Sequence, residues 1–195
     1  MKFEINKKVF EQYPELESDR LKYRQITLAD SETLFNIRTN PDVMKFMDVE
    51  ELKSLTESEE LINSIGESFK SGAGINWGMI EKSQNKFMGY FGIWKIDAKH
   101  CRGEIGYALL PEFWGKGYML EAAAKLIEYG FRELNLHSIE ANVNPDNSSS
   151  IKLLEKIGFR KEAHFRENYL FRNEFKDSFI YSLLESDLSQ KPSES

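Results

Sequence analysis

The amino-acid sequence predicts an α+β fold in which a mixed, mostly antiparallel sheet is flanked by helices. Three observations predict it. Two helical patterns lead into a pair of strands joined by a polar turn, a strand–turn–helix–strand unit follows, and an aromatic-rich pair of strands comes last. Because strands and helices do not alternate throughout, this order excludes a doubly wound sheet.

The first quarter of the chain predicts a strand followed by a helix. Residues 17–26 alternate imperfectly between apolar and charged side chains, which favours an opening strand. Thr27 and Asp30 then resemble a helix start. The pair Asn40-Pro41 ends this helix, because proline disfavours helical backbone in the residue before it.

A second helix is predicted to begin at Thr56, which has capping-box spacing with Glu59, and to end near Gly72. The segment 42–55 between the two helices receives no assignment. Strands over residues 75–80 and 87–96 follow, and the polar turn 81–86 joins them into an antiparallel hairpin.

Residues 103–131 form the unit around which the other elements are predicted to be organised. A short apolar strand opens at Glu104 and is stopped by Pro111, which cannot continue a sheet. A glycine-rich turn and a helix follow. We expect a buried helix face of Leu120, Ala123, Ala124, Ile127 and Phe131, with the i,i+4 ion pairs Glu121–Lys125 and Glu128–Arg132 on the other face.

The turn Trp114-Gly115-Lys116-Gly117 predicts an anion site. Glycines on both sides of a lysine let the backbone turn tightly and aim its N–H groups at one point, beside the positive end of a helix dipole. Phosphate or pyrophosphate suits such a site. The turn lacks the third small residue of a dinucleotide fingerprint, and no GxxxxGK[ST] occurs, so hydride transfer and nucleotide hydrolysis lose their main support.

The last third of the sequence predicts a strand starting near His137, a helix over residues 148–157 with Gly158 as its C-cap, and two strands over residues 160–184 about a turn near residues 172–174. Residues 1–184 are expected to form a single domain. Residues 185–195 are polar and are expected to be a frayed tail.

Composition limits the classes of function. A net charge of −6 and a pI near 5.3 argue against a general nucleic-acid binder, and one cysteine in 195 residues excludes an internal disulfide. No signal-peptide or membrane-spanning stretch is seen, so a soluble cytoplasmic protein is expected. The three histidines have no metal-ligand spacing, and no metal is expected. A monomer and a homodimer both remain open.

The segments EIGYALLPEFWGKGYMLEA and NPDNSSSIKLLEKIGF resemble the two signature segments of the GNAT superfamily of acyl-CoA-dependent N-acetyltransferases, and more narrowly its RimJ/RimL-like branch, which acetylates ribosomal-protein N-termini. The resemblance runs from about residue 16 to residue 184. It implies a sheet of about seven strands that splays at the cofactor site, with acetyl-CoA as acyl donor.

The resemblance also implies cofactor-binding residues. The pyrophosphate loop falls on Trp114, Gly115, Lys116, Gly117, Tyr118 and Met119, although many members have Gln or Arg at the first of these positions and Gly or Ala at the last. Leu109 and Leu110 are expected to leave backbone groups unpaired for the pantetheine arm and the thioester oxygen. Asn147, otherwise an ordinary helix cap, is expected to contact the same arm.

Two catalytic residues are candidates. Because no tyrosine lies between residues 148 and 157, where many members carry a general acid, Ser150 is the expected donor to the departing thiolate. Glu104 is the candidate base, although a glutamate at a strand start is more often a solvated edge residue. Strand aromatics are more often core than site, but five could wall the acceptor site: Trp77, Tyr90, Trp94, Phe165 and Tyr169.

The acceptor is expected to be a primary amine, most simply the N-terminal amine of a protein. A small amine, such as a polyamine, aminoglycoside or amino acid, is the alternative within the same chemistry, and residues 42–74 are expected to decide between them. The alternative to acetyl transfer is a module that binds acyl-CoA without turnover.

Overall fold

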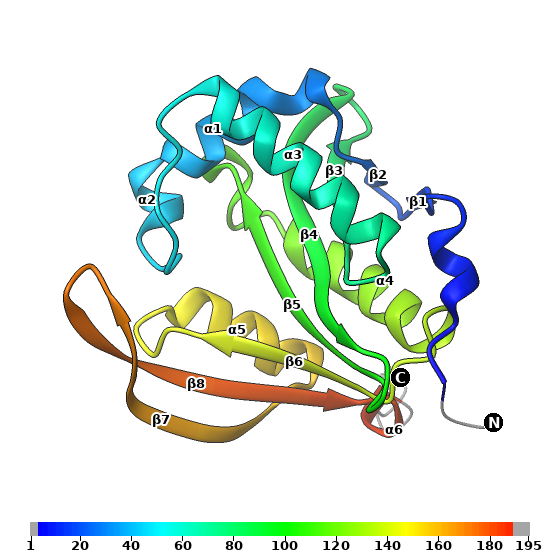
Figure 1. Ribbon diagram of the computed structural model, residues 1–195, viewed down its shortest axis with the longest axis vertical. Coiled ribbons are helices and arrows are strands. Elements are labelled where there is room, and N and C mark those ends of the chain that lie inside the picture. Colours follow the sequence, from blue (N-terminus) through cyan, green and yellow to red (C-terminus); the bar gives the residue numbers. More distant parts are fainter. Residues whose placement is uncertain (1–3, 189–195) are drawn as a thin grey trace.

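The chain folds around one eight-stranded sheet in the order β1-β2-β3-β4-β5-β6-β8-β7 (Figure 1). The computed structural model describes residues 4–188. All neighbouring strands are antiparallel except β5 and β6, which are parallel. The expected α+β class, with a mixed and mostly antiparallel sheet, is confirmed.

The strands are β1 (Leu16–Glu17), β2 (Leu21–Gln25), β3 (Ile75–Glu81), β4 (Lys86–Asp97), β5 (Arg102–Leu109), β6 (Ser138–Val143), β7 (Arg160–Phe171) and β8 (Glu174–Leu184). The α-helices are α1 (Ser31–Thr39), α2 (Pro41–Met44), α3 (Leu55–Lys70), α4 (Tyr118–Arg132), α5 (Ser148–Ile157) and α6 (Glu185–Leu188). Three short 3₁₀ helices complete the described part of the chain: Lys7–Phe10, Leu28–Asp30 and Pro111–Phe113. Helix α6 includes the first four residues of the expected tail, and residues 189–195 lie outside the described residues.

Local capping sets several of these boundaries. Helix α5 ends as expected at Gly158, whose φ of 114° is accessible to glycine and whose N–H donates to the carbonyl of Leu154. The predicted start of α3 at Thr56 is wrong. Ser54 is the N-cap and accepts a hydrogen bond from the N–H of Glu57, so the helix begins one residue before Thr56.

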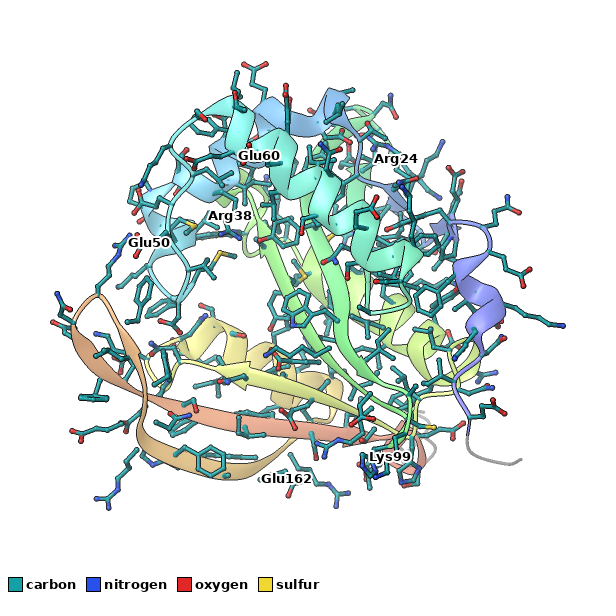
Figure 2. The ribbon with its side chains drawn as sticks, viewed as in Figure 1. Arg24, Arg38, Glu50, Glu60, Lys99 and Glu162 are labelled. Carbon is teal, nitrogen blue, oxygen red and sulfur yellow. The ribbon has the colours of Figure 1, made fainter. Side chains whose placement is uncertain are left out.

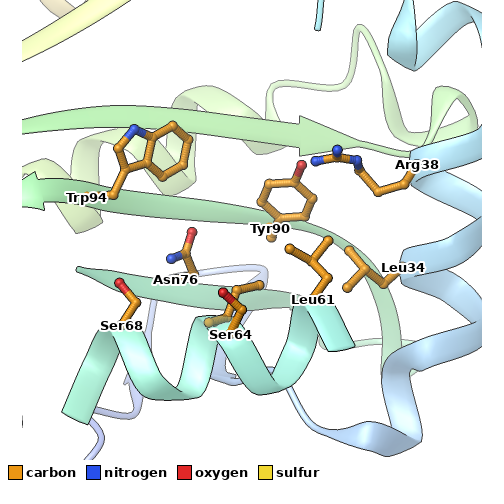
Figure 3. Close-up of a pocket in the computed structure, with 9 residues that line it drawn as sticks. Leu34, Arg38, Leu61, Ser64, Ser68, Asn76, Tyr90 and Trp94 are labelled. Atoms are coloured by element: carbon orange, nitrogen blue, oxygen red, sulfur yellow. The ribbon is translucent and has the colours of Figure 1, made fainter. Parts of the chain in front are cut away.

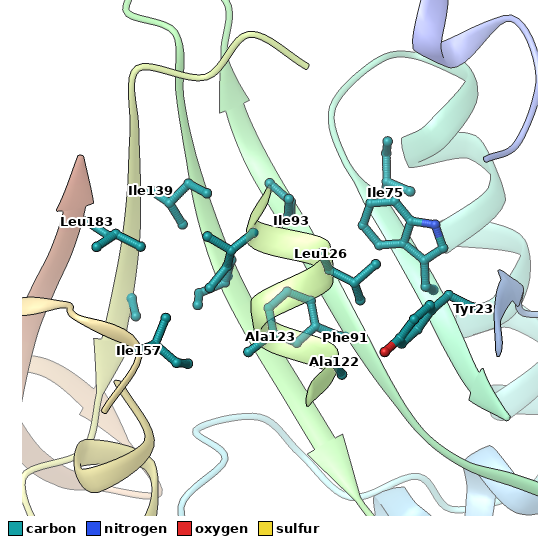
Figure 4. Packing of buried hydrophobic residues seen from close by; sticks show 14 of the residues in the cluster. Tyr23, Ile75, Phe91, Ile93, Ala122, Ala123, Leu126, Ile139, Ile157 and Leu183 are labelled. Carbon is teal, nitrogen blue, oxygen red and sulfur yellow. The ribbon is translucent and has the colours of Figure 1, made fainter. Parts of the chain in front are cut away.

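The buried face of α4 also differs from the prediction. Its buried residues are Ala122, Ala123, Leu126, Ile127, Gly130 and Phe131, whereas Ala124 is exposed. Figure 4 shows Ala122, Ala123 and Leu126 over Phe91 and Ile93 of the sheet. The sequence allowed two adjacent helix faces, and packing against β4 and β6 selects between them.

Helices cover the two faces of the sheet separately. Helices α4 and α5 lie on one face, with a core that includes Phe91, Ile93 and Ile105. Helices α1 and α3 lie on the other face, with a second buried cluster that includes Tyr90 and Ala108. Side chains alternate along a strand, so β5 presents Ile105 and Tyr107 toward α4 and α5, and Glu104 and Ala108 toward α1 and α3.

Strands β5 and β6 separate after three paired positions, the last of which is Glu104 with Glu140. Beyond it β5 remains paired with β4 as far as Leu109, and β6 remains paired with β8 along its whole length. Each strand follows its other neighbour, so an opening forms between them, which is visible where β5 and β6 diverge in Figure 1.

Gly89 gives a test of how closely β4 and β5 pack at the end of this opening. A Cβ at Gly89 would lie 2.2 Å from the carbonyl oxygen of Ala108, so Gly89→Ala should destabilise the fold by about 1–3 kcal/mol in chemical denaturation. Gly66→Ala in α3, where nothing lies within 4 Å of the added carbon, is the matched control and should stabilise by about 0.5–1 kcal/mol. Equal effects of the two substitutions would contradict this packing.

Candidate functional site

The glycine-rich turn has the backbone geometry of an anion site. Gly115 and Gly117 have φ values of 71° and 78°, in the left-handed region, and Gly117 is the N-cap of α4. No atom lies within 4 Å of a Cβ built on Gly115. The first N–H groups of α4, which have no intrahelical acceptor, therefore meet at an open surface that suits a phosphate group.

The other residues of the predicted loop surround this surface. Trp114 and Lys116 are exposed, and Tyr118 is partly buried. Met119 is partly buried, and its side chain packs against the apolar core.

Arg20 holds the turn in place, a role that was not predicted from the sequence. Its Nη1 donates to the carbonyl of Lys116 at 2.9 Å, and its guanidinium lies 4.3 Å from the centre of the Tyr118 ring. These contacts join residues 96 and 98 positions apart, so no local pattern predicts them. A cation therefore lies beside the proposed anion site.

Glu121 completes the contact and corrects a second prediction. Its carboxylate accepts hydrogen bonds from the Ser18 hydroxyl at 2.6 Å and from the Arg20 Nε at 2.7 Å, rather than pairing with Lys125. The predicted Glu128–Arg132 pair does form. Burial alone would raise the pKa of Glu121, but the hydrogen bonds from Ser18 and Arg20 together outweigh burial and lower it.

Backbone groups of β5 line the opening toward β6. Of the backbone groups expected to be unpaired at Leu109 and Leu110, the N–H of Leu110 is paired, because it donates to the carbonyl of Met88. Main-chain groups alternate in direction along an antiparallel pair, and those of Leu109 and Tyr107 therefore point away from β4 into the opening. The Leu109 carbonyl accepts a hydrogen bond from the Trp114 indole at 2.7 Å.

Ser150 and Tyr107 meet across the opening on the α4 and α5 face. Their hydroxyl oxygens lie 2.7 Å apart, and either can donate. Burial raises the pKa of Tyr107 to about 12, so its phenol stays protonated at neutral pH. Asn147 is the N-cap of α5 and accepts from the N–H of Ser150, which fixes where the serine lies. Tyr107 was not predicted as part of the site, because the family carries its tyrosine on the helix that corresponds to α5, whereas Tyr107 comes from β5.

Glu104 lies where β5 and β6 begin to separate, and its side chain is on the α1 and α3 face of the sheet, opposite Ser150 and Tyr107. One carboxylate oxygen accepts from the Trp94 indole at 3.2 Å, and the other lies 2.7 Å from the Lys95 ammonium. The Glu104 side chain is only 15% exposed, so it is not the solvated edge residue that its position in the sequence favours. Ser150 and Glu104 thus lie on opposite faces of β5.

A pocket of about 270 Å³ lies on the Glu104 face, between α1, α3, β3 and β4 (Figure 3). Its apolar walls are Leu34, Leu61, Ile65 and Trp94, and its polar lining is Arg38, Ser64, Ser68, Asn76 and Tyr90. Two of the five candidate wall aromatics, Tyr90 and Trp94, therefore line it. Trp77 is fully buried in the core of the other face, and Phe165 is half exposed.

The β7–β8 hairpin reaches the connection between α2 and α3, as Figure 1 shows. The Tyr169 hydroxyl donates to Asp48 at 2.6 Å, and the Arg172 guanidinium lies 3.1 Å from Glu50 and 3.5 Å from Glu51. The segment 42–55, left without assignment from the sequence, is thus partly held by contacts with residues more than a hundred positions away.

Within residues 4–188, no group of three or more His, Cys, Asp or Glu side chains is placed to hold a metal ion. No helix in this part of the chain has both the length and the apolar character needed to cross a membrane.

The chain is similar to known acetyltransferases. The family model "Acetyltransferase (GNAT) domain" matches residues 20–160. The uncharacterised N-acetyltransferase YoaA of Bacillus subtilis is 35% identical over 173 residues, 88% of this chain and 97% of the relative. The ribosomal protein uS5-alanine N-acetyltransferase of Escherichia coli is 28% identical over 131 residues, 65% of this chain and 66% of the relative.

Among solved structures, spermidine N-acetyltransferase from Vibrio cholerae, in complex with CoA and spermine, matches with a TM-score of 0.79 at 25% identity. The match covers 89% of this chain and 100% of that one.

Glu121 predicts a pH-dependent stability. Because its pKa is lowered in the folded state, its contribution is present at neutral pH and is lost as the pH falls below the ordinary value of 4.5. Glu121→Gln should lower the unfolding free energy by about 1–2 kcal/mol at pH 7, and the deficit should shrink on acidification. Denaturant titrations of both proteins at pH 7 and at a pH below 4.5 measure the two differences in unfolding free energy.

Glu128→Gln is the matched control on the same helix. It removes a pair with Arg132 in which both side chains are largely exposed, so its effect should stay within about 0.5 kcal/mol at either pH. A Glu121→Gln penalty that does not change with pH would contradict the assigned contact.

Proposed function

The chain belongs to the GNAT family of acetyltransferases, and from this premise we propose that it transfers the acetyl group of acetyl-CoA to a primary amine by direct attack within a ternary complex. The observation that carries the proposal is the opening between β5 and β6. It has the anion-binding turn at one end, Ser150 on one face and Glu104 on the other.

The residues around the opening fit acetyl-CoA. The N–H groups beside Gly115 and Gly117, with Arg20 next to them, suit the pyrophosphate. The main-chain groups of Tyr107 and the N–H of Leu109, which point into the opening, suit the amide groups of a pantetheine arm, whereas the Leu109 carbonyl is bound by the Trp114 indole. We assign the donor to the thioester oxygen to the N–H of Tyr107, in place of the N–H of Leu110, which is already paired.

The reaction needs a base, an oxyanion donor and a partner for the sulfur. Glu104, directly or through a water, takes a proton from the ammonium, and the amine nitrogen then attacks the thioester carbon. A C–N bond forms, the C–S bond breaks, and the electron pair leaves on the sulfur. The attacking nitrogen gives up its second proton through water to the departing sulfur, which leaves the neutral amide and the CoA thiol. The Tyr107 hydroxyl donates to Ser150, so that the Ser150 hydroxyl donates to the departing thiolate.

The acceptor predicted from the sequence is a protein N-terminal amine, and the uS5-alanine relative supports it. A small amine is the second candidate. The pocket supports it, because a space of about 270 Å³ beside Trp94 is below the roughly 300–1,000 Å³ that holds a drug-sized ligand. A protein N-terminus would place at most its first residue there.

Binding and turnover test the proposal separately. Saturating acetyl-CoA should raise the melting temperature by several degrees, about 5–10 °C at a hundredfold excess over Kd, whereas ATP and NAD should not. Gly117→Val should reduce the shift, because its left-handed φ of 78° disfavours a β-branched side chain, and the remote Gly66→Ala should not. No shift with acetyl-CoA would remove the proposal.

Free thiol release, measured with a panel of peptides, polyamines, aminoglycosides and amino acids, tests catalysis. Release with at least one amine is expected. An acetyl-CoA shift without release from any amine would favour the binding module over the enzyme.

The Ser150–Tyr107 pair predicts a specific kinetic pattern. Ser150→Ala should lower kcat by about 10–100-fold, and Tyr107→Phe by less, because the phenol acts through the serine. Acetyl-CoA affinity should change by less than about threefold in either variant. The double variant should resemble Ser150→Ala alone, since the two residues form one unit, and fully multiplicative losses would contradict the relay.

A further inference from the structure

Arg38 enters the pocket from α1 with a positive charge that no carboxylate neutralises. Its Nε is buried and has no hydrogen-bond partner, and it is the only such side-chain nitrogen or oxygen within residues 4–188. Its Nη2 makes one long contact, 3.4 Å, with the carbonyl of Glu50. Figure 3 shows the guanidinium pointing along the pocket toward the hydroxyl end of Tyr90.

The segment 48–51 contacts Arg38 through the Glu50 backbone, but its carboxylates are bound elsewhere. Asp48 accepts from Tyr169, and both Glu50 and Glu51 pair with Arg172 of the β7–β8 hairpin. The Glu50 backbone therefore touches Arg38 while its side chain is held by the hairpin. Figure 2 shows Arg38 and Glu50 as separate side chains on this part of the molecule.

The polar lining near Arg38 is also without internal partners. No hydrogen bond of the Ser64, Ser68 or Tyr90 hydroxyl, or of the Asn76 side-chain amide, is found in the described part of the chain. No acidic side chain is among the described residues that line the pocket. A partly buried cation and four neutral polar groups converge on one space, and the other walls are apolar.

We infer that this pocket binds the acceptor through a carboxylate, with Arg38 as its ligand, so that the acceptor class is a small amine carrying a carboxylate. The inference rests on the acetyl transfer proposed above and names its substrate class. A planar guanidinium matches a carboxylate with two parallel hydrogen bonds, and a bound carboxylate satisfies the buried Nε. A polyamine would instead bring positive charge beside an unneutralised cation.

The arrangement orients such an acceptor. Trp94 lines the pocket and also donates to Glu104, so one side chain connects the pocket wall with the candidate base. Tyr90 is paired with Ala108 and Trp94 with Glu104 on neighbouring strands. A carboxylate at Arg38 therefore leaves the amine end directed along β4 and β5 toward the opening, with the apolar part against Leu61 and Ile65.

Matched pairs of acceptors test the charge requirement. Thiol release is measured with leucine and leucinamide, with phenylalanine and phenethylamine, and with spermidine as the cationic comparison. The acids should exceed their partners that lack a carboxylate, and spermidine, in kcat/KM by at least about tenfold. Equal or higher values for the amide or for spermidine would overturn the inference.

Arg38→Met and Arg38→Lys assign the effect to this residue. Arg38→Met should lower kcat/KM for the acids at least about tenfold, mainly through KM, and change it for the amines without a carboxylate by less than about threefold. Arg38→Lys should keep part of the preference, because it keeps the charge but loses the two-pronged geometry. A loss shared equally by the acids and by the amines without a carboxylate would show a structural role and overturn the inference.

Binding provides a readout that does not need turnover. N-acetyl-leucine, the product expected from leucine, should bind the protein with CoA present in calorimetry, and Arg38→Met should abolish this binding while leaving the acetyl-CoA melting shift unchanged. If no amine releases thiol but N-acetyl-leucine binds through Arg38, the catalytic proposal fails and the carboxylate site stands. If peptides or polyamines release thiol and N-acetyl-leucine does not bind, the catalytic proposal stands and the carboxylate site is overturned.

Discussion

The end of the β5–β6 ladder at Glu104 and Glu140 is the constraint on which the site depends. Had the two strands stayed paired, the main-chain groups of Tyr107 and Leu109 would be used within the sheet, and no path would lead from one face to the other. The divergence costs hydrogen bonds that a ligand or water must replace. The sheet tolerates this cost because β5 and β6 each remain fully paired with the strand on their other side.

The same divergence separates two kinds of chemistry. The face of α4 and α5 carries the anion-binding turn and the Ser150–Tyr107 hydroxyls, and the face of α1 and α3 carries Glu104 and the pocket of Arg38. In the proposed reaction, proton removal from the amine and stabilisation of the thiolate would thereby be kept apart, so the base and the acid would not neutralise each other. Strand β5 carries Tyr107 on one face and Glu104 on the other, and β4 contacts both through Phe91 and Trp94.

Much of the fold and one half of the site could be predicted from the sequence, because their signals are local. The glycine turn, the caps of α5 and the hairpin turns depend on residues a few positions apart, where glycine conformation and capping act. Glu121 and Ala124 were assigned wrongly for the opposite reason. Helical spacing made Lys125 a reasonable partner for Glu121, but Arg20, brought near by the β1–β2 turn, provides a closer and better-hydrogen-bonded contact.

The proposed acceptor side could not be predicted from the sequence, and the physical reason also explains why Arg38 is left without a counter-ion. Arg38 has no sequence signal, because its character comes from what its neighbours do: Glu50 and Glu51 adjoin it but bind Arg172, which lies on a hairpin formed by the end of the chain. An arginine that is uncompensated only because distant residues take its counter-ions is a property of the assembled fold. In the proposed reaction the acetyl-donor side relies on backbone groups, which most sequences can supply. The proposed acceptor side relies on side-chain charge, so a few substitutions there would alter which amine is accepted while the β5–β6 opening stays intact.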